Sequence, residues 1–206
     1  MTFKKYDESE KGTFHYWFEH VKAYNWVALK WNVWKPKYLF HDFEKPWLKL
    51  VMGDYMKVRK YHKAHSRHHL GYQGHRKRDW EAMILDWECS RYTKLKNPLD
   101  CIETIDWMYR GGRIGMPEVI KLVGTYKNLK RHGNDEITCF CIGISGKEFE
   151  MVDSIPYFKI PGEKEVTSSF LVATMFGNKV INLVVSDKPE GSIILSEDVF
   201  QEFFRK

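Results

Sequence analysis

The fold is decided first by the stretch FHYWFEHVKAYNWVALKWNVW, residues 14–34. Its apolar side chains recur every three or four positions, at Phe14, Trp17, Phe18, Val21, Tyr24, Val27, Ala28 and Trp31. This spacing is the period of an amphipathic helix. We therefore predict a helix over 14–34, which must end before or at Pro36 because proline cannot continue a helix interior.

The same pattern continues toward the middle of the chain. It predicts further helices over residues 38–45, 46–67, 77–93, 99–110 and 117–129. Gly71 and Gly74 break the chain between two of them, and Asn97-Pro98 closes another. The tryptophans at 17, 31, 34, 80 and 87 occupy helix-packing positions, so we interpret them as core.

Beyond residue 136 the period changes. Short β-branched and aromatic runs, ITCFCIGIS (137–145), FLVATMF (170–176), KVINLVVS (179–186) and SIILS (192–196), predict strands. RHGNDE (131–136) is interpreted as a linker, and SEDVFQEFFRK (196–206) as a terminal helix with a capping pattern. The expected fold class is α+β, with an all-helical domain over residues 1–130 followed by a small, mostly β domain over 136–206.

Composition excludes several classes of protein. The 206 residues include 8 Trp, 11 Tyr and 13 Phe, enough apolar surface to exclude disorder over most of the length. No run of about 18 uncharged apolar residues occurs, and MTFKKYDESEKG (1–12) has no apolar segment after its lysines. We therefore expect a cytoplasmic protein with no membrane partner, whose four cysteines are reduced thiols.

Charge and histidine are unevenly distributed. Residues 137–206 hold 7 Lys+Arg and 10 Asp+Glu, a net of −3, so the total of +6 leaves +9 on residues 1–136. Eight of the nine histidines also precede residue 108. The chemistry of the protein is therefore expected in the N-terminal part.

Four histidines fall within the run HKAHSRHH, residues 62–69. If the run is helical, His62, His65 and His69 lie within an arc of about 60°, while His68 points elsewhere. Imidazoles bind Zn, Mn, Fe, Co and Ni, and added carboxylates suit two-metal hydrolytic centres. A solvated face of Lys, Arg and His is the alternative interpretation of the same run.

Other candidate ligands precede and follow this run. His41-Asp42 comes directly after apolar residues 38–40, where unpaired polar groups are costly, and metal coordination would satisfy both. Asp86 lies beside the apolar stripe of a predicted helix, where a carboxylate is either salt-bridged or a ligand. His20 lies near the middle of the first predicted helix.

The ordered set is His20 in FEHVKAY, His41-Asp42 with Lys45 in FHDFEK, His62 with His68-His69 in HKAHSRHH, and Asp86 in ILDWE. In this order and spacing the chain resembles the HD-domain metal-dependent phosphohydrolases, most closely a small group of HD-like proteins from bacteria and phages. The resemblance covers residues 14–95 and implies a helical HD-like domain and, for a phage protein, the host cytoplasm. Glu44 and Ser66 depart from that group, which usually carries Ser and often Asn there.

The resemblance also implies a set of roles. His20, His41, Asp42 and Asp86 would hold a first divalent transition metal, and His62, His69 and His68 a second, with Asp42 able to bridge. One or two ions of Mn, Fe, Co, Ni or Zn per chain are thus expected. The implied activity is hydrolysis of a nucleotide or related phosphoester by metal-activated water, with Asp42 and Lys45 as catalytic residues and Lys45 holding a phosphate or developing oxyanion. A solvated surface lysine is the alternative interpretation of Lys45.

A basic stretch, GYQGHRKRD (71–79), follows the histidines. Arg76, Lys77 and Arg78 are predicted to contact substrate phosphates, because a positive loop beside a metal site attracts anions. A solvated charge run explains the same residues. Tyr72 is a candidate for stacking on a base.

Two other functions remain open. In one, the chain is a non-catalytic module with a structural metal or none, and its +9 region contacts nucleic acid or a protein partner. In the other, the histidines serve an oxygen-activating di-iron centre, which the small number of carboxylates disfavours. The phosphohydrolase interpretation predicts a phosphorylated small molecule, a nucleotide above all, as the partner. Nucleic acid and a second copy of the chain are further candidates.

Overall fold

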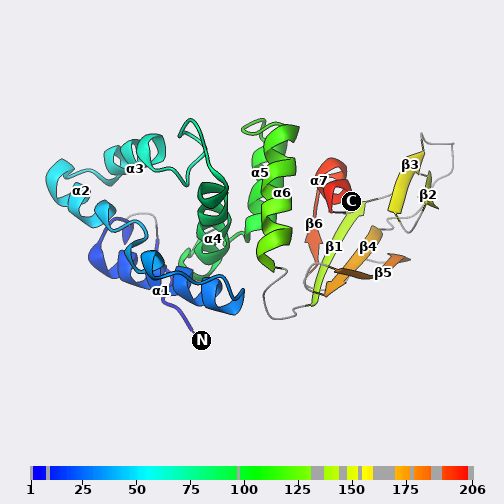
Figure 1. Ribbon diagram of the computed structural model, residues 1–206, viewed down its shortest axis with the longest axis horizontal. Helices are drawn as coiled ribbons and strands as arrows, with labels where there is room; N and C mark the ends of the chain where they lie inside the picture. Colours follow the sequence, from blue (N-terminus) through cyan, green and yellow to red (C-terminus); the bar gives the residue numbers. More distant parts are fainter. Residues whose placement is uncertain are drawn as a thin grey trace. The chain divides into compact units, whose positions relative to one another are not determined.

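The computed structural model describes residues 2–7, 10–96, 98–130, 137–143, 148–152, 155–159, 170–176, 179–186 and 192–203 (Figure 1). The chain forms two compact units. Unit 1 comprises Met1–Thr104 and Gly124–Gly133, and unit 2 comprises Ile105–Val123 and Asn134–Lys206. The chain is mostly helical with a smaller strand region, as predicted. The predicted linker over 131–136 lies outside the described residues.

The helical part contains α1 (Phe14–Lys30), the 3-10 turn η2 (Pro36–Phe40), α2 (Glu44–Met52), α3 (Tyr55–His65) and α4 (Lys77–Thr93). α5 (Cys101–Arg110) and α6 (Met116–Lys130) follow, each with residues in both units. The bounds of α4 are those predicted from the sequence. None of the helices in the described part of the chain combines the length and the hydropathy needed to cross a membrane.

α1 is shorter than predicted. It begins after Thr13, whose hydroxyl accepts a hydrogen bond from the Tyr16 N–H at 3.2 Å. It ends at Lys30 and not at residue 34, because Asn32 adopts a left-handed conformation with φ of 54°. The predicted end of this helix was therefore wrong by four residues.

The predicted helices over 38–45 and 46–67 are also corrected. The first is the short η2 turn, and the second is divided into α2 and α3 at Gly53-Asp54. Gly53, with φ of 68°, ends α2, and the Asp54 carboxylate caps α3 by accepting from the Met56 N–H at 2.8 Å. A glycine followed by a capping residue ends one helix and begins the next, even where the spacing of the apolar residues continues across both.

The core of unit 1 forms mainly where α1 packs against α4. Its largest fully buried side chains include Tyr24, Trp31, Met83, Ile84 and Leu85. The Trp31 ring meets Tyr126 of α6 edge-on at 5.7 Å between centroids. Trp31 and Trp87 are buried as predicted, but Trp34 is 38% exposed, and its indole N–H donates to Oδ1 of the buried Asn25 at 2.6 Å.

Unit 2 contains a four-stranded sheet in the order β5-β4-β1-β6. Its strands are β1 (Ile137–Gly143), β4 (Phe170–Phe176), β5 (Lys179–Ser186) and β6 (Ile193–Ile194), with β1–β4 and β4–β5 antiparallel and β1–β6 parallel. A separate antiparallel pair, β2 (Glu148–Val152) and β3 (Ile155–Lys159), was not predicted. The predicted terminal helix is α7 (Glu197–Glu202), preceded by Ser196, whose N–H donates to Asp106 Oδ1 at 2.7 Å.

Candidate metal centre

Three segments of unit 1 bring a first group of buried ligands together. His20 lies on α1, His41 and Asp42 follow η2, and Asp86 lies on α4. His20 Nε2 is 2.9 Å and His41 Nε2 is 3.4 Å from Asp86 Oδ1. We call these four residues the first cluster; one ligand atom from each lies within 4.8 Å of the others, so the group could hold a metal ion.

The turn that carries His41 and Asp42 has an unusual backbone. Asp42 has a φ of 57°, in the left-handed region that aspartate tolerates better than most residues. Hydrogen bonds fix the turn on both sides: Trp17 Nε1 donates to the His41 carbonyl at 2.8 Å, and the Lys45 N–H donates to the Asp42 carbonyl at 3.0 Å. The carboxylate of Asp42 is thereby directed into the protein.

Neighbouring side chains orient the imidazoles of the first cluster. Tyr24 stacks on His41 with 4.0 Å between centroids, and Tyr16 stacks on His20 at 5.6 Å. The free thiol of Cys89 lies 3.7 Å from His20 Nδ1 and 3.9 Å from His20 Nε2. The Nε2 atoms of His20 and His41 face the carboxylates of Asp42 and Asp86, which is the orientation that a metal bound between them would need. In the sequence the two tyrosines and the cysteine belong to the apolar stripes of α1 and α4, which carry no signal of this role.

A second cluster consists of His62, His68 and His69, whose ligand atoms also lie within 4.8 Å of one another. His62 is in the last turn of α3, and the other two lie on the turn that follows it. His62 Nε2 and His68 Nε2 are 3.1 and 3.0 Å from Asp42 Oδ1. Asp42 is thus shared, because its Oδ2 faces His20 and His41 at 3.8 and 3.6 Å.

The atoms at this junction are polar, buried and poorly satisfied. Asp42 Oδ1 and the Nε2 atoms of His62, His68 and His69 make no hydrogen bond of proper geometry with any described residue. The short separations between them lack hydrogen-bond angles, although buried polar groups are normally hydrogen-bonded. The three imidazole nitrogens lie within 4.8 Å of one another, and those of His62 and His68 also lie beside Asp42 Oδ1. Imidazole and carboxylate are donors that borderline divalent metals prefer. The side chains therefore fit a metal at the second cluster as well.

The predicted grouping of His62, His65 and His69 on one helix face was wrong. α3 ends at His65, so the helical spacing does not extend to residue 69. His65 is exposed, with its Nδ1 donating to the Tyr61 carbonyl at 2.8 Å and its ring stacked on Tyr61. His68, which a continuous helix would direct elsewhere, takes its place beside Asp42.

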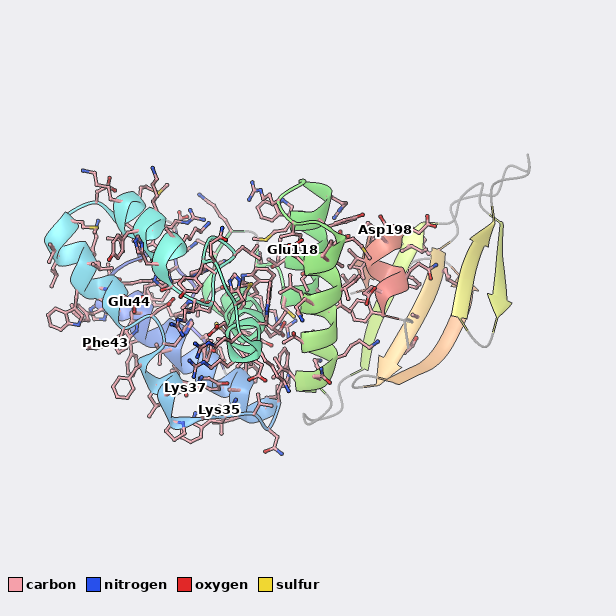
Figure 2. The ribbon with its side chains drawn as sticks, turned by 45° about the horizontal axis from the view of Figure 1, so that its top comes forward. Lys35, Lys37, Phe43, Glu44, Glu118 and Asp198 are labelled. Atoms are coloured by element: carbon pink, nitrogen blue, oxygen red, sulfur yellow. The ribbon has the colours of Figure 1, made fainter. Side chains whose placement is uncertain are left out.

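Glu44 and Ser66 position one ligand of the second cluster. Glu44 Oε1 is 2.6 Å from His62 Nδ1, and Ser66 Oγ is 3.0 Å from the same nitrogen. Figure 2 shows Glu44 at the start of α2. A carboxylate that holds one ring nitrogen turns the other toward a metal. The sequence marked both residues only as departures from the resemblance, so their shared partner was not predicted.

Burial and nearby charges set the protonation of the first cluster. Burial lowers the pKa of His41 to about 4, which leaves this imidazole neutral near pH 7. Burial alone would raise the pKa of Asp42, but His41, Lys45, His62 and His68 hold it well below its usual range. Asp86 is likewise kept ionised, because hydrogen bonding to the imidazoles outweighs its burial and lowers its pKa. Ionised carboxylates and neutral imidazoles are the forms that bind metal.

Lys45 is not a solvated surface lysine. Its side chain is only 16% exposed, and its ammonium forms an ion pair with Asp42 Oδ2. Burial would lower its pKa, but the carboxylate of Asp42 raises it above the ordinary value. The structure therefore places a permanent positive charge beside the shared ligand.

The basic residues 76–78 are not brought into the clusters. Arg76, Lys77 and Arg78 are exposed at the start of α4, and the rise of a helix puts residue 76 about 15 Å along the axis from Asp86. The preceding loop does reach the second cluster, because His75 Nε2 donates to the His69 carbonyl at 2.8 Å. These side chains are therefore at the edge of the centre and not within it.

Comparisons with protein-family models, curated proteins and solved structures give no match to this chain. The function must therefore be argued from the two clusters themselves. Their chemistry is that of a buried aspartate shared between two groups of imidazoles, with a second aspartate on one side and a lysine beside the shared one.

Proposed function

We propose that the chain is a metal-dependent phosphohydrolase of the HD type, which cleaves a nucleotide or a related phosphoester by metal-activated water. The observation that carries the proposal is Asp42, whose two carboxylate oxygens face different clusters of potential ligands. One or two divalent ions of Mn, Fe, Co, Ni or Zn would bind per chain. The order of ligands along the sequence, from His20 to Asp86, supports the HD assignment.

Because the two clusters offer different donors, they would bind different metals, or bind the same metal with different affinity. The first offers two imidazoles and two carboxylates, and the second offers three imidazoles, two of which lie beside Oδ1 of Asp42. A pair of metal ions lowers the pKa of a bound water to near neutrality and stabilises the attacking and leaving oxygens of a phosphoester.

The protein would contribute charge and access. The Lys45 ammonium beside Asp42 can stabilise negative charge that develops on phosphoester oxygens. The exposed cations Arg76, Lys77 and Arg78 would raise the local concentration of phosphates without forming part of the metal centre.

Elemental analysis of untagged protein tests the proposal. We expect about two metals per chain in the wild type and near-complete loss in Asp42→Asn, because the shared ligand is removed from both clusters. Asparagine tolerates the left-handed conformation at this position, so the variant tests the charge and not the backbone. His65→Ala is the matched control, since His65 is exposed and outside both clusters; it should retain the wild-type metal content.

Hydrolysis of bis(4-nitrophenyl) phosphate with added Mn, Co, Ni, Fe or Zn is the second measurement. Asp42→Asn should lose at least about 100-fold in rate, and His65→Ala should keep its activity. Less than about 0.2 metal per wild-type chain after reconstitution would contradict the proposal.

A further inference from the structure

Four large aromatic side chains form an exposed surface on unit 1. Phe14, Phe40, Phe43 and Trp47 are 41%, 67%, 41% and 51% exposed, and we call them the aromatic surface. Their rings are in mutual contact. Phe43 lies 6.4 Å from Phe40 and 6.2 Å from Trp47, and Phe14 lies 5.3 Å from Trp47, between centroids. Isolated exposed apolar residues need no explanation, but a contiguous patch marks an interaction site.

The aromatic surface begins next to the candidate metal centre. Phe43 directly follows the shared ligand Asp42, and its ring contacts Trp17 at 5.4 Å. Trp17 in turn donates its indole N–H to the carbonyl of His41 at 2.8 Å. Figure 2 labels Phe43 and Glu44 at the start of α2. A ligand that covers these rings would therefore lie close to the ligands of the first cluster.

The same part of the chain carries the positive charge of the protein. Residues 35–78 hold 12 Lys+Arg and 3 Asp+Glu, a net of +9, which equals the net charge of the whole region 1–136. Most of these cations are exposed, including Lys37 before the aromatic surface and Arg67 beside the second cluster. Lys35 is also exposed, but its ammonium pairs with Glu81 Oε2 at 3.1 Å. Positive charge on this scale favours a polyanion, because each neutralised phosphate releases condensed counterions.

We infer that this face binds single-stranded nucleic acid, with bases stacked on the aromatic surface and phosphates held by the surrounding cations. Exposed aromatic rings interleaved with basic side chains are the features that bind single strands without reading their sequence. A mononucleotide would cover one ring and few of the charges, whereas a strand uses both features. A duplex hides the faces of its bases, so it could use only the charges. Cleavage of the strand rests on the proposed hydrolase function, but binding does not.

A membrane or an apolar protein partner would use a different part of this face. Leu50, Val51 and Met56, at the corner between α2 and α3, are 67%, 85% and 62% exposed. Aliphatic side chains offer no stacking surface for bases, and in membrane binding they would be the side chains that insert into the bilayer. They lie on or directly beside the helix that carries Trp47, so their variants are matched controls for the aromatic ones.

Fluorescence anisotropy with the full chain and labelled strands tests this inference. The probes are oligo-dT and oligo-rU of about 20 nucleotides and a duplex of the same length, each titrated over a range of salt. We expect the single strands to bind more tightly than the duplex, with affinity that falls steeply as salt rises. Phe40→Ala and Trp47→Ala should each weaken strand binding about 10-fold, and Leu50→Ala and Val51→Ala less than about 2-fold. Phe40 is the more exposed of the two aromatic residues, so its truncation leaves folding least affected.

Other outcomes would overturn the inference. Equal affinity for strand and duplex, or no effect of the aromatic variants on strand binding, would each do so. If either result is accompanied by binding to phosphatidylserine vesicles that only Leu50→Ala and Val51→Ala reduce, the face is assigned to a membrane instead. Metal content and bis(4-nitrophenyl) phosphate hydrolysis are measured on the same preparations. A wild type that holds metal and cleaves this ester but binds no strand overturns the inference alone. A wild type that binds strands but no metal overturns only the hydrolase proposal.

Discussion

The two ligand clusters are built in contrasting ways. The first joins residues up to 66 positions apart in sequence, on α1, the turn after η2, and α4, and its carboxylates are already paired with imidazoles. The second comes from the eight residues 62–69, and its Nε2 atoms lack hydrogen bonds to the described residues. The fold itself therefore maintains the first cluster, whereas the second consists of neighbouring ligands on a helix end and a turn.

The largest expected effect is on the free energy of unfolding of the metal-free protein, which should depend more on the first cluster than on the second. Asp86→Asn should lower the free energy of unfolding by about 2–3 kcal/mol, because Asp86 is buried and accepts charge-assisted hydrogen bonding from His20 and His41. His69→Ala should cost less than about 1 kcal/mol, since its Nε2 has no hydrogen bond to lose among described residues. Urea denaturation in the presence of a chelator measures both. Equal losses would contradict the contrast.

Metal affinity provides the next test. Glu44→Ala should weaken binding of one ion by about 10–100-fold and leave the other unchanged, because Glu44 pairs with His62 and Ser66, and of these only His62 is a candidate ligand. Titration with Co(II), followed by its visible absorption, resolves the two sites. Glu44→Gln keeps an oxygen that can accept from His62 Nδ1 and should recover part of the loss. Weakening of both sites to the same extent would show that the clusters are not independently supported.

The turn that carries His68 and His69 offers a smaller test. A Cβ added at Gly71 would lie 2.7 Å from the Lys63 carbonyl oxygen, which belongs to the backbone of α3. Gly71→Ala should therefore displace the turn and cost about 1–2 kcal/mol. Gly74→Ala is not a matched control, because Gly74 has a φ of 79°, but Gly124 has no atom near its Cβ position. Thermal unfolding should separate Gly71→Ala from Gly124→Ala, and identical midpoints would contradict the prediction.

The sequence predicted some parts of this centre better than others. The resemblance to HD-domain proteins, carried by the order of His20, His41-Asp42 and Asp86, implied their grouping, and the structure brings their ligand atoms within 4.8 Å of one another. The break at Gly53-Asp54 was missed because the apolar period continues across it. That break does not alter the ligands of the first cluster, but the end of α3 at His65 decides which histidines form the second.

The aromatic surface was not predicted for a related reason. Apolar residues at helical spacing normally face a core, and periodicity alone does not show which face is covered. Over η2 and α2 much of the apolar face is exposed, as at Phe40 and Trp47. The role of Glu44 depends on a contact with residue 62, 18 positions away, which no local pattern reveals.

The Asp100 carboxyl, which lies outside both clusters, gives the smallest expected effect on stability. Its contribution changes with pH in the direction opposite to that of Asp42 and Asp86. Burial and the neighbouring Glu88 raise the pKa of Asp100 to about 7, although Arg91 and the Glu103 N–H act against this. The folded chain then binds more protons than the unfolded chain between about pH 4 and 7, so stability falls as pH rises through this range. For Asp42 and Asp86, whose pKa values are lowered, stability is instead lost as pH falls.

Urea denaturation at pH 5 and 6 isolates this contribution. Asp100 should account for a loss of about 1 kcal/mol over that interval, and Asp100→Asn should remove it. Asparagine can still accept from the Glu103 N–H, so the cap of α5 is retained. The same pH slope in the variant and the wild type would contradict the prediction.

The local origin of the second cluster has a consequence for refolding. Eight consecutive residues with four histidines can chelate a metal ion before any helix has formed, whereas His20 and Asp86 meet only after α1 and α4 have packed. An ion captured early by residues 62–69 binds the denatured chain as well as the native one, and this reduces the net stabilisation that excess metal supplies. Protein refolded with a chelator and loaded afterwards should therefore give a higher yield than protein refolded in the presence of the metal.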